Sequence, residues 1–209
     1  SGDGGRIETS GNYISVDGAQ VNASATFGDS GLWLLDPRDV FITASATSNG
    51  AFAGGDPDIF TPTGDSANVD VATIIGTLNI STDVTINTGS TGSQRGDITV
   101  NVDIPKTFGS DGALTLIAAN DIFINADITS VSGGLPLTFN ADSDGDGAGA
   151  IFITGRLISR AAFIDFQGDV YITGTTPGQT LLWTTQSGDI DFRGEVYIAD
   201  LSTFTIDTS

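Results

Sequence analysis

The chain has 209 residues, with 26 acidic against 7 basic side chains, and it contains no Cys, His or Met. A formal charge of −19 leaves too few cations to neutralise phosphates, which disfavours nucleic acid and anionic membrane surfaces as partners. The missing Cys and His exclude disulfides, thiolate metal sites and the commonest general base, and no apolar run approaches the roughly 20 residues of a spanning helix. Divalent cations, neutral glycans and other proteins are the partners that this composition allows.

The amino-terminal part of the chain alternates between apolar and polar residues. This alternation predicts short strands over residues 6–9, 13–16, 19–24 and 31–35. A turn at residues 36–38 leads into Asp39-Val40-Phe41-Ile42-Thr43, an acidic residue followed by a strand whose second and fourth positions share one face. Residues 45–68 are rich in Ser, Gly, Asp, Pro and Thr, which predicts a surface loop inserted between strands.

One helix is predicted, over residues 71–78. Asp70 is a suitable residue to cap it, and Ile74, Ile75 and Leu78 would share one face. We expect this short helix to lie against the wall of the β-structure.

The five-residue pattern that begins at Asp39 returns along the whole chain. Further copies begin at residues 83, 97, 121, 150, 169 and 189, with a looser copy at 195, and the later intervals are 24, 29, 19 and 20 residues. A strand that recurs in this way is typical of a solenoid. The sequence therefore predicts an all-β fold, a right-handed parallel β-helix over residues 1–209, triangular in section, with three strands in each of about eight rungs.

The run Gly31-Leu32-Trp33-Leu34-Leu35-Asp36-Pro37, followed by Asp39-Val40-Phe41-Ile42, resembles the "WLLDP…(I/V)xI" signature of filamentous haemagglutinin-like exoproteins. The match covers residues 1–155 in order. The resemblance implies a shaft segment of a very large β-helical surface protein of a Gram-negative bacterium, exported by two-partner secretion and acting as an adhesin, a biofilm factor or a carrier of toxins. It implies no catalytic residue at any position.

The segment Asp142-Ser143-Asp144-Gly145-Asp146-Gly147 is the sharpest candidate site. Alternate carboxylates with Gly in sixth place match the first half of an EF-hand calcium loop, and calcium takes about six to eight hard oxygen ligands. Ile153 stands where the twelfth-position Glu of that loop belongs, so a solvated turn between rungs is the alternative. A weaker acidic set lies at Asp56, Asp58 and Asp65.

The third position of the repeated strand points outward and carries an aromatic stripe. Its members are Phe123, Phe152 and Tyr171, with Tyr197 further on. These rings could bind sugar rings by face contact, or they could stack on one another as side chains do in other solenoids.

A charged cluster at Asp189, Asp191, Arg193 and Glu195 contains the groups of a glycosidase that uses two carboxylates. Carboxylates recur at the same rung position throughout, however, which favours a role at corners, and we expect no enzyme. The sequence predicts a structural and adhesive shaft segment, secreted and attached to the cell surface, that contributes to adhesion, biofilm or extracellular fibre formation and contacts a cell-surface glycan or protein receptor. The alternatives are a glycan-binding or polysaccharide-degrading β-helix and a subunit of a head-to-tail fibre joined through two open solenoid ends.

Overall fold

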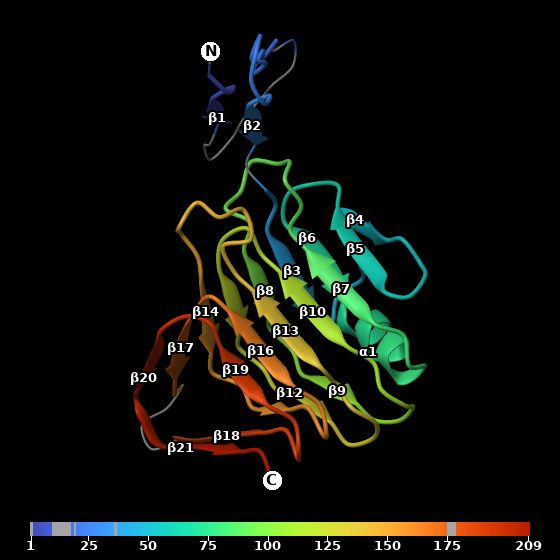
Figure 1. Ribbon diagram of the computed structural model, residues 1–209. Helices are drawn as coiled ribbons and strands as arrows, with labels where there is room; N and C mark the ends of the chain where they lie inside the picture. Colours follow the sequence, from blue (N-terminus) through green and yellow to red (C-terminus); the bar gives the residue numbers. More distant parts are fainter. Residues whose placement is uncertain (1, 10–17, 19, 36, 175–178) are drawn as a thin grey trace.

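The computed structural model describes residues 2–9, 18, 20–35, 37–174 and 179–209. Its body is a parallel β-solenoid in which three sheets form a triangular arrangement, as predicted (Figure 1). The first sheet contains, in spatial order, β4 (Gly50–Phe52), β5 (Asp58–Pro62), β7 (Val84–Asn87), β10 (Leu114–Ile117), β13 (Leu137–Asn140), β16 (Ile164–Gln167) and β19 (Ile190–Phe192).

The other two sheets run beside the first. The second sheet contains β6 (Ala67–Asp70), β3 (Val40–Thr43), β8 (Ile98–Val100), β11 (Ile122–Ile124), β14 (Ala150–Ile153), β17 (Asp169–Thr173) and β20 (Val196–Ala199). The third contains β9 (Ile104–Lys106), β12 (Ile128–Ser130), β15 (Leu157–Ile158), β18 (Gln179–Thr184) and β21 (Leu201–Asp207). Each coil passes through the sheets in this order and then returns to the first.

About six turns stack in this way, fewer than the eight predicted. The repeats at residues 39, 97, 121, 150, 169 and 195 lie in the second sheet, but those at 83 and 189 lie in the first. The pattern of an acidic residue followed by an alternating strand therefore marks two corners of the coil, so counting its copies overestimates the rungs.

The core lies inside the triangle and is filled from all three sheets. In β11, Ile122 and Ile124 are fully buried, while Phe123 between them faces outward and is half-buried. Leu114, Leu116 and Ile128 fill the same coil from its other two sides. Because successive side chains of a strand alternate between two faces, this period of two produces a continuous apolar column along the axis.

One end of the column is covered by α1 (Val71–Asn79). The side chain of Asp70 accepts a hydrogen bond from the Ala72 amide at 2.9 Å, which caps the helix as predicted. Ile74 and Leu78 are fully buried in the core, and the helix contacts β9 most extensively. It thus takes the place of a third-sheet strand and closes the end of the stack, whereas the sequence predicted a position along a side wall.

The other two sheets are covered at the same end by residues 45–68, which were predicted as a surface loop. Strands β4 and β5 in this segment form an antiparallel hairpin, and β5 also pairs with β7. Phe60 is fully buried because Ile59 and Phe60 alternate across the strand, a signal hidden by the polar residues around it. Ser48 and Asn68 exchange two backbone hydrogen bonds along the edge of β6. We call this closed end the head.

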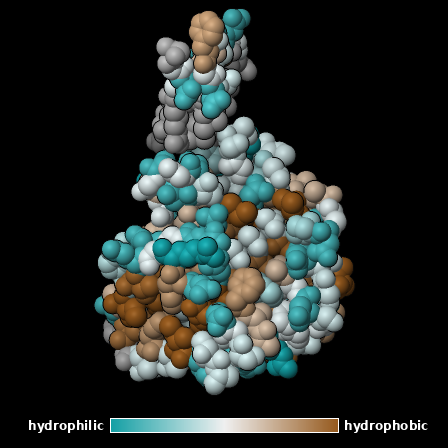
Figure 2. Space-filling view, in the orientation of Figure 1, coloured by the Kyte–Doolittle hydropathy of each residue, from teal (hydrophilic) through white to brown (hydrophobic). Residues whose placement is uncertain are grey.

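The opposite end, which we call the tail, consists of β19, β20 and β21, the last strands of their sheets. Val196 and Ile198 continue the buried positions of Val170 and Ile172 but are 40% and 54% exposed. Figure 2 shows hydrophobic residues gathered at this end, over β20 and β21 at lower left. The sequence predicted two open ends, and within the described residues the structure has one.

An amino-terminal arm stands apart from the body, at the top of Figure 1. It contains β1 (Arg6–Thr9) and β2 (Leu32–Leu35), which pair in parallel as a separate sheet. Residues 20–24 form no strand, contrary to prediction, and the predicted strand at 13–16 lies outside the described residues. No helix in the described part of the chain is long and apolar enough to cross a membrane.

Candidate functional site

The acidic residues at the corners of the coils contact the next coil. The Asp97 carboxylate accepts hydrogen bonds from the Asp121 amide at 3.1 Å and from the Asn120 side chain at 2.6 Å. A side-chain oxygen likewise accepts a hydrogen bond from a backbone amide of the adjacent coil at Asp39, Asp56, Asp83, Asp103, Asp111, Asp121, Asp127 and Asp169. Each bond satisfies an amide that the bend at a corner leaves free of the sheet ladder.

Two of these corner carboxylates are partly withdrawn from water. Burial raises the pKa of the Asp39 carboxyl above 3.8, although amide hydrogen bonds from Asp97 and Gly96 oppose the shift. Burial likewise raises the pKa of Asp121, and the hydrogen bond from the Ala150 amide opposes it. Burial penalises the charged form of a carboxyl group. Asp39 and Asp121 therefore join adjacent coils at some electrostatic cost.

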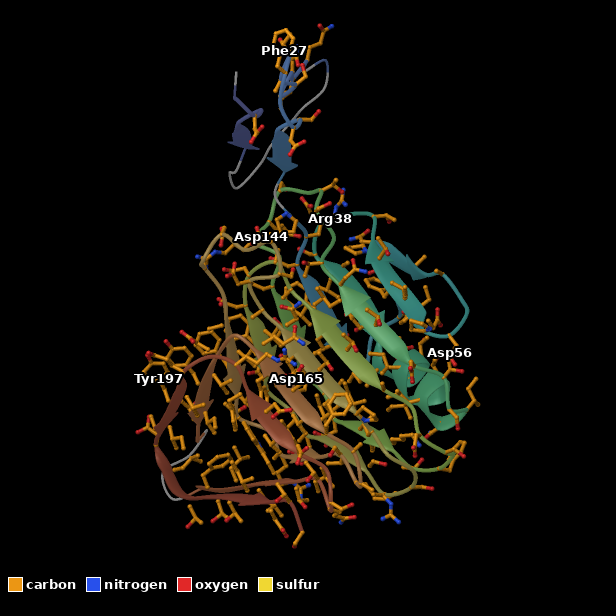
Figure 3. All side chains as sticks on the ribbon, in the orientation of Figure 1. Phe27, Arg38, Asp56, Asp144, Asp165 and Tyr197 are labelled. Atoms are coloured by element: carbon orange, nitrogen blue, oxygen red, sulfur yellow. The ribbon has the colours of Figure 1, made fainter. Side chains whose placement is uncertain are left out.

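The predicted calcium loop lies between β13 and β14, and Figure 3 shows Asp144 at the upper corner of the body. The structure brings Asp142, Asp144 and Asp146 together, with one carboxylate oxygen of each within 4.8 Å of the others. Asp142 and Asp144 are half-buried and Asp146 is exposed. The Gly147 amide donates to both carboxylate oxygens of Asp142, at 3.1 and 3.2 Å, which folds the loop back on itself.

This donor set suits a hard divalent cation. Calcium binds oxygens at about 2.3–2.6 Å, so two of its ligands can lie up to about 5 Å apart, and the three carboxylates meet that limit. Their formal charge of about −3 would favour the ion at this corner of an already acidic chain. Three carboxylates supply about half of the ligands, and carbonyls and water would have to supply the others.

The outward aromatic stripe forms a continuous stack on the second sheet. Ring centroids of Phe123 and Phe152 lie 5.1 Å apart, those of Phe152 and Tyr171 5.0 Å, and those of Tyr171 and Tyr197 4.6 Å. The rings are inclined by 9–17°, so each face lies against the next ring. Both faces of Phe152 and Tyr171 lie against neighbouring rings, so a face that a sugar would need is free of another ring only at the two ends of the stack. These are the face of Phe123 toward Thr99 and the outer face of Tyr197 at the tail, which Figure 3 shows at the left edge of the body.

The charged cluster predicted at residues 189–195 is divided between two sheets. Asp191 lies on β19 in the first sheet, whereas Glu195 precedes β20 in the second and accepts a hydrogen bond from the Tyr197 hydroxyl. Arg193 binds Asp165 of the previous coil through Nε and Nη2, both at 2.8 Å. Arg193 therefore has a structural partner. The carboxylates of the cluster do not converge on one point.

Asp165 is a residue that sequence reasoning missed. It faces outward on β16, yet only 7% of it is exposed. Burial would raise the pKa of this carboxyl, but hydrogen bonds from Arg193 and Gln167 and the charge of Arg193 hold it below 3.8. The available signal was an Asp within one strand and an Arg just after the neighbouring strand of the same sheet, about one coil apart.

Lys106 is a second group that the sequence did not reveal. It is fully buried, and its ammonium donates to the carbonyls of Phe108 at 3.0 Å and Ser132 at 2.7 Å. Burial lowers the pKa of Lys106. The hydroxyl of Ser130, the neighbouring position in the next coil, donates to the carbonyls of Ser132 and Gly133. The pair thus satisfies carbonyls at the corner between the third and first sheets.

The weaker acidic set does not come together. Asp56 accepts from the Asp83 amide at 2.9 Å and Asp58 accepts from the Gly54 amide at 2.7 Å, while Asp65 lies 3.7 Å from Arg38. These three carboxylates therefore stabilise separate parts of the head.

Comparison with known proteins gives this chain no family. No protein-family model matches it, and no curated protein is significantly similar to it.

Proposed function

We propose that this chain is a rigid shaft segment of a secreted, surface-attached filamentous protein that contributes to adhesion, biofilm or extracellular fibre formation. The observation that supports this most strongly is the use of the acidic side chains. Corner carboxylates on all three edges of the body bind the next coil, as Asp39 does at 3.0 Å, Asp83 at 2.8 Å and Asp103 at 3.0 Å. Carboxylates that bind the next coil contribute to the length and stiffness of the solenoid, and they are not gathered at a reactive centre.

The resemblance of residues 31–42 to filamentous haemagglutinin-like exoproteins supports the same function. It implies two-partner secretion and a position on the outer surface of a Gram-negative cell. A shaft of this kind would present loops and outward faces to a cell-surface glycan or protein receptor. The stripe that contains Phe152 fits a structural part in the shaft, because its rings stack on one another.

We also propose calcium as a structural ion of the loop that contains Asp142, Asp144 and Asp146. The proximity of their carboxylates supports it. The ion would bind at a corner between the first and second sheets and stiffen a loop that projects from the shaft.

Immunogold electron microscopy tests the proposed function. Antibodies raised against the purified chain would be applied to unpermeabilised cells of the source organism, with antiserum preabsorbed on the chain as the control. Gold particles along filaments or at the outer surface are expected. Gold confined to the interior of sectioned cells, with none outside, would contradict the proposal.

A further inference from the structure

The outward aromatic stripe of the second sheet is interrupted at β8. In β11, β14, β17 and β20 this position carries an aromatic ring, but in β8 it carries Thr99. Phe41 of β3 lies in register on one side of Thr99, and Phe123 of β11 lies in register on the other. All three residues are half-buried and lie on the outer face of the sheet. Two aromatic side chains therefore flank one small side chain in the middle of this face.

The gap over Thr99 has the width of one six-membered ring. Phe152 shows this width directly, because its ring fills one coil of the same stripe, with centroid distances of 5.1 Å to Phe123 and 5.0 Å to Tyr171. Phe41 and Phe123 are likewise two strands apart, which is about 9.5 Å at the usual strand spacing of about 4.8 Å. The short side chain of Thr99 leaves open the place that a ring takes in the following coils.

Polar side chains lie beside the gap on the same face. Asn101 and Asn125 follow β8 and β11 directly and are exposed at the next outward position. The Asn125 amide donates to Oδ1 of Asn101 at 3.2 Å, which leaves Nδ2 of Asn101 to donate and Oδ1 of Asn125 to accept. A few polar groups beside aromatic side chains fix the orientation of a ligand. With the Thr99 hydroxyl between the rings, this set suits a ring that carries hydroxyl groups.

Acidic residues beside the gap determine which charge a ligand can carry. Asp39, Asp97 and Asp121 stand one residue before β3, β8 and β11. Like charges repel, so these carboxylates disfavour a sugar that carries a carboxylate of its own, such as a sialic or uronic acid. The site therefore favours a neutral hexose.

We propose that Phe41, Thr99 and Phe123 form a binding subsite for a neutral hexose, whose ring lies between the two aromatic side chains in the gap over Thr99. The C–H groups of the sugar would contact the aromatic faces, and its hydroxyl groups would bond to Thr99 and Asn101. The subsite lies inside the body, on strands that are paired on both sides. The proposal rests on the proposed function, since it names the receptor of the shaft as a glycan that exposes neutral hexoses.

Saturation-transfer NMR on the full chain tests the subsite, with methyl β-D-galactoside and methyl β-D-glucoside as probes. We expect saturation transfer to the ring protons of at least one probe. A single hexose is small, so the dissociation constant should be of about millimolar order. N-Acetylneuraminic acid, which carries a carboxylate, should bind at least about tenfold more weakly.

T99F fills the gap with the ring that the following coils carry. It should weaken hexose binding at least about tenfold. It should leave the fold intact, because Phe152 occupies the same position two coils later. T115F is the matched control, since Thr115 is a half-buried outward residue of β10 with Thr85 and Thr138 on either side. This control should change the dissociation constant less than about twofold, and circular dichroism checks that both variants fold.

F41L tests the second wall of the gap. Leu keeps an apolar side chain at this position but removes the aromatic face, so F41L should weaken hexose binding at least about fivefold. Binding that F41L leaves unchanged would contradict a sugar held between two rings.

The proposal fails if neither hexoside shows saturation transfer at about 50 mM, or if T99F binds the sugar as the parent chain does. Stronger binding of N-acetylneuraminic acid than of either hexoside would contradict the preference for a neutral sugar. Stronger binding of p-cresol would assign the gap to an aromatic side chain of a protein partner. Immunogold microscopy reports the location of the chain independently, so gold at the cell surface without hexose binding would overturn the subsite alone.

Discussion

The Asp97 carboxylate accepts a hydrogen bond from the backbone amide of Asp121, at 3.1 Å, across the gap between two coils. Asp121 in turn accepts from the amide of Ala150 at 2.9 Å. A series of such contacts joins this corner of each coil to the same corner of the next coil, in addition to the backbone hydrogen bonds of the sheets. The recurring acidic residue is therefore part of what specifies the stacking, and it accounts for much of the negative charge.

Replacing Asp97 tests the value of one corner contact. D97A would leave the Asp121 amide without its acceptor and should lower the free energy of unfolding by about 1–3 kcal/mol. D97N keeps a side-chain oxygen at the same place and should recover most of this loss. Chemical denaturation followed by circular dichroism measures both. A D97A variant as stable as the parent chain would show that the corner contact adds nothing.

The raised pKa values of Asp39 and Asp121 predict a pH dependence. Their folded pKa values lie above 3.8, so in the window just above 3.8 the folded chain binds more protons than the unfolded chain. The free energy of unfolding then falls as pH rises through that window. It should therefore be larger near pH 4.5 than at pH 7. D39N, which cannot ionise but keeps an acceptor, should reduce the difference. Urea denaturation across this range measures it, and a steady loss of stability on acidification from pH 7 would contradict it.

The aromatic stack predicts a stability effect on the outer face. Phe152 stacks on Phe123 and on Tyr171, at 5.1 and 5.0 Å, and each such contact contributes about 0.5–1.5 kcal/mol. F152T should therefore cost about 1–3 kcal/mol. Thr99 occupies the same register two coils earlier, so the backbone position accepts Thr. T129A, on the third sheet, is the control and should change stability by less than about 0.5 kcal/mol. Equal effects of both variants would mean that the stack is not a stabilising feature.

The acidic loop predicts stabilisation by calcium. For a dissociation constant of about 0.1–1 mM, as in extracellular calcium modules, 10 mM calcium should raise the free energy of unfolding by about 1.4–2.7 kcal/mol. D144N removes one of the three carboxylates, leaves Asp142 to hold the loop through Gly147, and should abolish most of the gain. Thermal unfolding with calcium and with chelator measures it, with D191N as a charge-matched control. The same response to calcium in D144N and in the parent chain would exclude this loop as the calcium site.

The recurrence of one strand pattern along the chain was enough to predict the parallel solenoid. Alternation of period two within each strand shows which side chains enter the core. The helix was predictable from Asp70 and the spacing of Ile74 and Leu78. The proximity of Asp142, Asp144 and Asp146 followed from their alternation on a tight loop.

The other features of the fold and the site depend on which strands are neighbours. A local sequence pattern does not encode this information. The copies at Asp83 and Asp189 look like those at Asp97 and Asp169, since both corners need an acceptor for the next coil. The hairpin around Phe60 was hidden by polar neighbours. Arg193 and Asp165 meet only because β16 and β19 stack on each other, so their contact could be predicted only from the length of the coil between them.

Two cysteine variants test directly whether the solenoid lies outside the cell, as proposed. Val84 is fully buried and Thr85, the next residue of β7, faces outward. A membrane-impermeant maleimide on intact cells should label T85C, and should label V84C only after denaturation. Labelling of T85C only after lysis would contradict an exterior location, and equal labelling of both variants on intact cells would contradict the fold.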